Sequence, residues 1–211
     1  MILDFEVYVF DCDGVILDSN KIKGNVFKIV LDEFPARKVK KFLKFHYDNG
    51  GVSRFLKFKY FFEEVHIVDD PDTFVKDYSN KFSSMVKSQL LKSTLVPGVE
   101  NFLRILKLNK KLCFVNSGSE QNELIEILTK KEISKYFDLI LGSPKSKVEN
   151  NEIIENLSKG QKKKIFFGDS KNDYVAAKKS GMDFVFLSQF SEWKNPHGKF
   201  YKTINNFEEL I

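Results

Sequence analysis

The sequence predicts an α/β protein: a Rossmann-like parallel sheet core with an inserted α-helical cap domain. Two observations carry this prediction. In the second half of the chain, short apolar runs alternate with amphipathic helical patterns, which is typical of a parallel sheet covered by helices. Between residues 19 and 94, long helical stretches rich in Lys and Phe replace that alternation. With 211 residues and 42% hydrophobic content, the chain is long enough for a core and a modest insert.

Five apolar runs predict the strands of the core, and polar clusters directly follow four of them. The strands are expected at residues 5–10, 112–115, 139–141, 165–167 and 184–187. Helices are expected at residues 98–108, 120–130, 148–158 and 172–180. Repeats of strand, helix and strand place the carboxyl ends of parallel strands at one edge of the sheet. The polar clusters should therefore meet there.

The helical insert follows the first strand and ends before the turn at Pro97 and Gly98. Its helices are expected at residues 20–33, 36–46, 52–66 and 72–91. In the third, Phe55, Phe58 and Phe62 recur at helical spacing, which favours the packed core of a helix bundle. We predict a core domain made of residues 1–18 and 95–211, and a helical cap domain, acting as a lid, made of residues 19–94.

The composition gives little indication of a nucleic-acid or membrane partner. The 34 basic and 29 acidic residues leave a formal net charge of +5, so the lysines are expected on a mixed, solvated surface. No apolar run approaches the roughly 20 residues of a membrane-spanning helix. Cys12 and Cys113 lie at strand-like apolar positions, which predicts reduced, buried thiols. We expect a cytoplasmic monomer or homodimer, with no nucleic acid and no membrane as partner.

The stretch VFDCDGVILDS, residues 9–19, places two carboxylates at the end of the first strand. Side chains of an extended strand alternate between faces, so Asp11 and Asp13 should point to one side while Cys12 points away. Two adjacent carboxylates repel each other unless a cation lies between them or one is protonated. Oxygen ligands favour a hard ion, so Mg²⁺ is the expected cofactor. The alternative is a pair of acids that caps the next helix.

Three further strands end in residues suited to phosphate chemistry. NSGS, residues 116–119, offers a hydroxyl and backbone N–H groups before a helix, although Ser-Gly-Ser is also common in loops and caps. GSPKSK supplies Lys145 and Lys147, and a lone loop lysine is commonly solvent-exposed. GDSKND adds Asp169 and Asp173, the second of which also suits the first turn of a helix. Their convergence at one sheet edge favours a shared site.

In order and spacing, DCDGVILDS, NSGS, the loop lysine and GDSKND resemble the four motifs of the haloacid-dehalogenase-like hydrolases. The first and last of these motifs are highly specific, and the resemblance covers nearly the whole chain. The position of the helical insert resembles the cap of the phosphoglycolate-phosphatase and β-phosphoglucomutase branch. Within the insert, GGVSR, residues 50–54, is similar to the substrate-specificity segment of that branch.

The resemblance implies a role for each matched acid. Asp11 would be the nucleophile that forms an aspartyl phosphate, while Asp13 would protonate the leaving oxygen and later deprotonate the hydrolytic water. The carboxylates of Asp11 and Asp169 and the backbone carbonyl of Asp13 would hold Mg²⁺. Asp173 would lie in the outer shell of the metal.

The resemblance also implies a phosphate-binding set. Ser117 and the N–H of Gly118 would bind the transferring phosphoryl oxygens, and Lys147 would neutralise their charge and that of the nucleophile. Two of these assignments stay open, since Asn116 competes with Ser117 and Lys145 competes with Lys147. We favour Lys147, because the family usually has its lysine where the following helix begins.

The expected function is Mg²⁺-dependent hydrolysis of a small phosphorylated metabolite, such as a sugar phosphate or phosphoglycolate. Asp13 favours phosphate esters, because relatives that act on carbon–halogen or phosphonate bonds lack an Asp there. The mutases of the family carry a cap histidine about twelve residues beyond the nucleophile, where this chain has Lys23. A phosphosugar mutase is therefore the less favoured alternative, and a catalytically idle binding protein of the same fold is another.

Arg54 is the cap residue expected to contact the substrate. A guanidinium pairs bidentately with a second anionic group or with sugar oxygens. Lys57, one helical turn further on, is a second candidate for substrate binding, and a surface role is the alternative for Arg54. His46 and His66 are expected to be surface residues of the cap.

Overall fold

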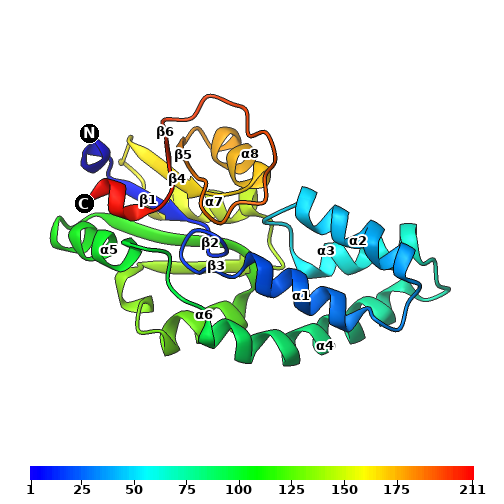
Figure 1. Ribbon diagram of the computed structural model, residues 1–211. Coiled ribbons are helices and arrows are strands. Elements are labelled where there is room, and N and C mark those ends of the chain that lie inside the picture. Colours follow the sequence, from blue (N-terminus) through cyan, green and yellow to red (C-terminus); the bar gives the residue numbers. More distant parts are fainter.

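Six parallel strands form one sheet in the order β3-β2-β1-β4-β5-β6 in the computed structural model, which describes residues 1–211 (Figure 1). The strands are β1 (Val7–Phe10), β2 (Leu112–Glu120), β3 (Leu139–Ser143), β4 (Lys164–Gly168), β5 (Asp183–Leu187) and β6 (Lys202–Ile204). From β1 the chain adds β2 and then β3 on one side, and it later adds β4, β5 and β6 on the other side. The direction of winding therefore reverses between β1 and β4, and a crevice forms at the carboxyl ends of these two strands. The predicted α/β fold with a parallel sheet is confirmed.

Helices cover both faces of the sheet. One face packs against α5 (Val99–Leu108) and α6 (Gln121–Lys130), and the other packs against α7 (Lys147–Leu157) and α8 (Lys171–Lys179). The side chains of β1 alternate accordingly: Tyr8 and Phe10 belong to the first core, and Val7 and Val9 to the second. All residues of β1 and β4 are buried, as is typical of strands covered on both faces.

Four helices between β1 and α5 pack together beyond the carboxyl edge of the sheet (Figure 1). They are α1 (Asn20–Val30), α2 (Ala36–Asp48), α3 (Arg54–Tyr60) and α4 (Pro71–Lys92). Their apolar sides meet around the ring of Phe27, whose centroid lies 5.2 Å from that of Phe42, 5.3 Å from that of Phe58 and 4.2 Å from that of Phe82. Phe58 and Phe62 are buried in this helix-bundle core, as predicted, whereas Phe55 is only half-buried and lies outside it.

The third predicted helix of the insert is divided. Ser53 caps α3 by accepting a hydrogen bond from a backbone N–H of its first turn, and the helix ends at Tyr60. A π-helical turn, η2 (Phe61–Val65), follows directly. Two consecutive phenylalanines of this turn, Phe61 and Phe62, are fully buried, which a regular amphipathic helix with one apolar side does not favour.

The segments that join these helices to the sheet run side by side. The N–H of Asp18 donates to the carbonyl of Thr94 at 3.0 Å, and the N–H of Val96 donates to the carbonyl of Ile16 at 2.9 Å. This pairing lies where the sequence predicts the two domain boundaries. We call helices α1 to α4 and their loops the cap, and the division into two domains stays a prediction.

A few elements differ from the sequence-based expectation. The sequence predicts a loop at NSGS, but β2 continues to Glu120, and its register against β3 shifts between Asn116 and Glu120. The short strand β6 and the 3-10 turns carry too little apolar periodicity to be predicted. These turns are η1 (Ile2–Asp4), η3 (Ser134–Tyr136) and η4 (Phe207–Leu210).

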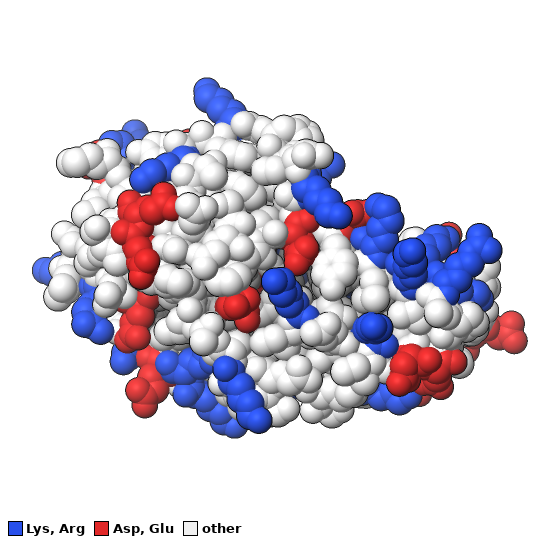
Figure 2. All heavy atoms as spheres, viewed as in Figure 1, with Lys and Arg blue, Asp and Glu red and all other residues white.

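The surface carries charges of both signs. Lys and Arg lie interspersed with Asp and Glu over the face seen in Figure 2, without an unbroken basic stripe. No helix is both long and apolar enough to cross a membrane. Cys12 and Cys113 are free thiols buried in the core, as predicted, and burial raises the pKa of Cys113 to about 12.

Candidate active site

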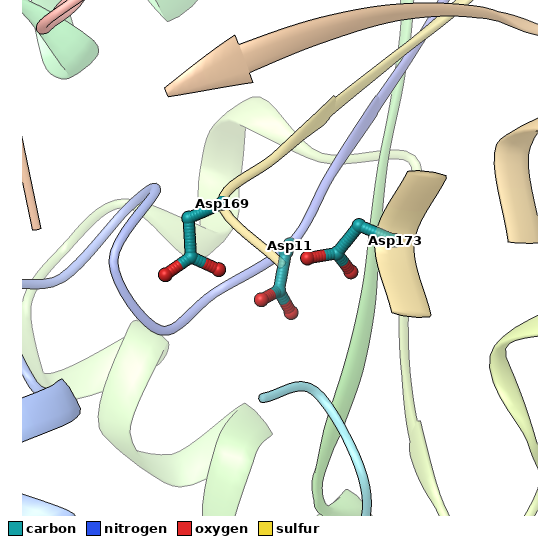
Figure 3. Close-up of side chains that lie close together, drawn as sticks. All are labelled: Asp11, Asp169 and Asp173. Atoms are coloured by element: carbon teal, nitrogen blue, oxygen red, sulfur yellow. The ribbon is translucent and has the colours of Figure 1, made fainter. Parts of the chain in front are cut away.

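Three buried carboxylates meet at the crevice between β1 and β4 (Figure 3). Asp11 directly follows β1, Asp169 directly follows β4, and Asp173 lies in the first turn of α8. One ligand oxygen from each lies within 4.8 Å of the others. Because β1 and β4 are parallel neighbours, their carboxyl ends bring the two distant sequence motifs together.

Lys147 completes this cluster. It is the first residue of α7, where Ser146 caps the helix, and its Nζ lies 2.6 Å from Oδ1 of Asp11 and also pairs with Asp173. Burial alone would lower the pKa of Lys147, but the two carboxylates together raise it above the usual range. Lys145 is exposed, so Lys147 is the loop lysine that the structure brings to Asp11.

The negative charge of the three carboxylates exceeds the positive charge around them. Burial raises the pKa of Asp11 to about 7, with Lys147 opposing the rise and the carboxylates of Asp173 and Asp13 adding to it. Burial, followed by the charges of Asp173 and Asp11, raises the pKa of Asp169 well above its usual value. The ammonium of Lys147 alone does not balance the three carboxylates. Buried negative charge therefore remains, and a bound cation would stabilise it.

The donor atoms fit a hard cation such as Mg²⁺. The cluster offers carboxylate oxygens, without thiols or imidazoles. Asp173 offers less to a metal than Asp11 and Asp169, because its Oδ2 accepts hydrogen bonds from the N–H and the hydroxyl of Ser170. Gly14 permits a close approach, since a Cβ at that position would lie 2.3 Å from Oδ2 of Asp169.

Asp13 does not share this carboxylate cluster. The sequence argument placed a cation between the carboxylates of Asp11 and Asp13, but β1 ends at Phe10, so strand alternation no longer governs both side chains. Oδ1 of Asp13 accepts from the Ser19 hydroxyl at 2.6 Å, and Oδ2 lies 2.5 Å from Nζ of Lys23.

The surroundings of Asp13 favour its charged form. Burial alone would raise its pKa, but Lys23 and the hydroxyls of Ser19 and Ser119 lower it below the usual value. Ser119 donates to Oδ2 at 3.0 Å, and Lys23 also donates to the Ser119 hydroxyl at 2.7 Å. Lys23 therefore links the cap helix α1 to two side chains of the sheet edge.

The end of β2 separates the roles of Asn116 and Ser117. The Asn116 side chain is buried against α7, where it donates to the carbonyl of Lys147 and to Asn151, both at 2.8 Å. The Ser117 hydroxyl instead lies 3.2 Å from that of Ser119, on the side of Asp13. The side chain of Asn116 is thus engaged in packing against α7. Ser117 is the residue whose hydroxyl lies on the side of Asp13, the proposed acid.

The loop between α2 and α3 covers the site. A Cβ at Gly118 would lie 2.2 Å from the carbonyl oxygen of Gly51, so only glycine allows the cap loop to rest on β2. The side chain of Asn172 donates to the carbonyl of Gly50 at 2.6 Å, which fixes the same loop to α8. The cap is closed over the carboxyl edge of the sheet.

Arg54 lies buried at the junction of cap and core, which contradicts the alternative of a surface role, and its guanidinium already pairs with a carboxylate. Its Nη1 lies 3.0 Å and 2.9 Å from the two oxygens of Glu123 on α6, and Nη2 lies 3.3 Å from the hydroxyl of Ser83 on α4. The pair is almost completely buried. Its proposed contact with substrate stays a prediction.

Lys57 points into the interior next to His46. Its Nζ lies 2.8 Å from Nδ1 of His46, and both residues are buried. The expectation that His46 is a surface residue is wrong, because α2 turns this side chain against the ring of Phe27. His66 is half-buried and contacts Lys38.

Two adjoining cavities open beside the cluster. The smaller, of about 50 Å³, is lined by Asp13, Lys23, Arg54 and Lys57 among others. The larger, of about 270 Å³, lies between the cap and the loop after β5 and reaches Asp169. The residues that line both are Asn20, His46 and Gly50.

Sequence reasoning missed several residues of this region. Lys23 was visible as the residue in the position of the mutase histidine, yet its contact with Asp13 was not expected. Asn20 directly follows the first motif, and its amide donates to Asp169 at 2.6 Å. Glu123 and His46 carry no sequence signal, because they reach the site only through packing of the cap on the sheet.

Comparison with known proteins agrees with this fold. The chain is 25% identical over 189 residues to the phosphorylated carbohydrates phosphatase of Thermotoga maritima, covering 86% of this chain and 84% of that protein. Its fold is similar to CbbY from Rhodobacter sphaeroides in complex with phosphate, with a TM-score of 0.77, 15% identity and coverage of 98% and 96% of the two chains. A predicted phosphoglycolate phosphatase from Haemophilus somnus 129PT gives a TM-score of 0.77 at 20% identity, with the same coverage of 98% and 96%.

The family signature spans both halves of the site. The sequence profile of the haloacid dehalogenase-like hydrolases matches residues 8–187, from β1 to the end of β5, and so includes the motifs that carry Asp11, Lys147 and Asp169. The chain belongs to the haloacid dehalogenase-like hydrolases.

Proposed function

We propose that this chain is a Mg²⁺-dependent phosphatase that hydrolyses a small phosphomonoester through an aspartyl phosphate on Asp11. The observation that carries the proposal is the meeting of Asp11, Lys147 and Asp169 at the ends of adjacent elements. Family membership supports hydrolysis. The name of the Thermotoga maritima relative supports a sugar phosphate as the substrate, and the small, cation-lined cavity also suits a phosphoglycolate-like ester.

In the first half of the reaction, a carboxylate oxygen of Asp11 attacks phosphorus, and the bond from phosphorus to the ester oxygen breaks. Asp13, which Lys23 and two hydroxyls keep ionised in the ligand-free chain, takes up a proton from solvent as the anionic substrate binds, and gives it to the departing oxygen, which leaves as an alcohol. The hydroxyl of Ser117 and the N–H of Gly118 bind the phosphoryl oxygens. Lys147, beside Asp11, balances the negative charge that collects there.

In the second half, water attacks the phosphorus of the aspartyl phosphate while the Asp13 carboxylate takes its proton. The bond between phosphorus and the Asp11 oxygen breaks, which releases inorganic phosphate and restores the carboxylate. Lys23 and Ser119 hold the Asp13 side chain during both steps. The closed cap loop at Gly50 and Gly51 limits the entry of bulk water.

Mg²⁺ fits the oxygen donors of the site. The carboxylates of Asp11 and Asp169 and the backbone carbonyl of Asp13 would hold the ion, and Asp173 would lie in its outer shell. When bound, Mg²⁺ supplies positive charge that reduces the repulsion between these carboxylates and the phosphoryl group. Burial raises the pKa values of Asp11 and Asp169, so a positive charge beside them would favour their ionised forms.

The test is release of inorganic phosphate from p-nitrophenyl phosphate and from a panel of sugar phosphates and phosphoglycolate, with Mg²⁺ and with a chelator. We expect Asp11→Asn to lower kcat by roughly 10³-fold or more, because it removes the nucleophile. The matched control is Asp183→Asn, an exposed acid at the start of β5, which should keep full activity.

Three results would contradict the proposal. Activity that survives Asp11→Asn would exclude this residue as nucleophile. Interconversion of sugar phosphates without release of inorganic phosphate would favour the mutase alternative. Inactivity of the folded, Mg²⁺-loaded chain against the whole panel would favour the binding protein.

A further inference from the structure

Three cations line the smaller cavity, and two of them already face a carboxylate. Lys23 pairs with Asp13 at 2.5 Å, and Arg54 pairs with Glu123 at 2.9 Å. Lys57 is the third, and it forms no ion pair; the side-chain atom within hydrogen-bond distance of its ammonium is Nδ1 of His46. The cavity therefore contains one cation that the protein itself leaves without an anion.

The burial of Lys57 makes this lack of an anion costly. The residue is 4% exposed, and its Nζ lies 5.8 Å from the centroid of the Phe27 ring. A buried ammonium without a carboxylate loses hydration that a neutral imidazole only partly replaces. This unfavourable burial occurs at a position that lines a cavity beside the proposed catalytic acids. Its location indicates that an anionic ligand binds there.

His46 fixes the direction of the Lys57 side chain. The imidazole is 7% exposed and packs on Phe27 with a centroid distance of 4.7 Å, so its ring cannot turn freely. Burial first, and then the charges of Lys57 and Lys23, lower the pKa of His46 well below its usual value, so the ring is neutral. Its Nδ1 therefore accepts from Lys57 and leaves the other ammonium protons for a ligand.

The position of the cavity identifies which part of a substrate would reach Lys57. Asp13, Gly118 and Ser119 line the same cavity from the core side. Under the proposed mechanism, Asp13 protonates the leaving oxygen, so the alcohol part of the ester extends from there into the cavity towards the cap. Lys57 faces that alcohol part, while Lys147 serves the transferring phosphoryl group.

We propose that Lys57, oriented by His46, binds a second oxyanion, a carboxylate or a phosphate, on the alcohol part of the substrate. The enzyme would thereby select phosphomonoesters that carry two anionic groups. This inference rests on the proposed function. It moves the second-anion contact from Arg54, whose charge Glu123 already satisfies, to Lys57 one turn further along α3.

The experiment compares matched pairs of esters. Phosphoglycolate is paired with 2-hydroxyethyl phosphate, which replaces the carboxylate by a neutral alcohol, and a pentose bisphosphate is paired with the pentose monophosphate. We expect a higher kcat/KM for the doubly anionic ester in at least one pair, and the pair that responds identifies carboxylate or phosphate as the second group. Lys57→Met should reduce this preference about 30-fold or more, mainly through KM. Lys57→Arg should restore part of it.

A matched control and a binding measurement separate this inference from the proposed function. Lys59→Met removes an exposed lysine of the same helix and should leave the preference unchanged. Calorimetry with Asp11→Asn measures binding of the intact doubly anionic ester without turnover, and the added Lys57→Met change should weaken it by a similar factor.

The possible outcomes are distinct. Equal kcat/KM within both pairs, or a preference that Lys57→Met leaves intact, would overturn the inference while the phosphatase proposal stands. An inactive chain that still binds the doubly anionic ester through Lys57 would contradict the phosphatase proposal and support the anion site. Inactivity without Lys57-dependent binding would overturn both.

Discussion

Lys57 illustrates, at the scale of one residue, how the proposed anion site would lower the stability of the fold that carries it. Burial first, with Lys23 and Lys147 adding to it and Asp13 and Asp11 opposing it, lowers the pKa of Lys57 to about 7 from a usual value of 10.5. The unfolded chain therefore binds a proton that the folded chain releases between these values. The free energy of unfolding should rise with pH across this window, and the full cost of the buried charge is present below pH 7.

Lys57→Met should accordingly stabilise the ligand-free protein. The methionine keeps the apolar stem and removes the buried ammonium, so Tm should rise by about 2–4 °C for each kcal/mol gained. The gain should be largest at or below pH 7 and shrink towards pH 10, where the parent lysine is already neutral. Thermal unfolding at several pH values, with Lys59→Met as control, measures this. A variant that is less stable than the parent at pH 7 would contradict the assignment.

The carboxylates of the site were predictable residue by residue because their positions follow from local rules. Asp11 and Asp169 directly follow buried strands, and parallel neighbours bring such positions together. The turn of the Asp13 side chain away from Asp11 was not predictable. It depends on Lys23 and Ser119, which come from other elements.

At the scale of elements, the ion pair of Arg54 and Glu123 joins the cap to the core. It connects α3 to α6, and Ser83 of α4 hydrogen-bonds to both partners. No pattern in the sequence of α6 distinguishes Glu123 from the surface acids around it. The helix itself was predictable from apolar spacing, whereas the partner of a buried charge is decided by how two helices dock.

Glu123→Ala should destabilise the protein by about 3–5 kcal/mol, because it leaves the Arg54 guanidinium buried without a counter-charge. Replacing both partners by apolar residues, Arg54→Met with Glu123→Leu, should recover most of the loss. Glu126→Ala breaks exposed pairs with Lys87 of α4 and with Lys130 of α6 itself, and it should cost less than about 1 kcal/mol. Denaturant titration measures all three. Equal effects of Glu123→Ala and Glu126→Ala would show that the buried pair has no special role.

At the scale of the whole molecule, the buried carboxylates would couple the proposed metal binding to stability. The folded state raises the pKa of Asp11 to about 7 from 3.8, with burial as the largest cause. The metal-free folded protein therefore holds a proton that the unfolded chain has lost, and its stability should fall as pH rises through this window. A bound cation replaces that proton and removes the penalty.

Mg²⁺ should thus raise Tm, and the rise should be larger at pH 8 than at pH 5.5, where protons compete with the metal for Asp11. At a concentration of 100 times Kd, the expected gain is about 2.7 kcal/mol, or roughly 5–10 °C for a chain of this size. Asp169→Asn should abolish the shift, while Asp183→Asn, at an exposed position on the neighbouring strand, should keep it. The measurement is thermal unfolding with Mg²⁺ or a chelator at both pH values. A shift that is independent of pH, or that survives Asp169→Asn, would place the ion outside this cluster.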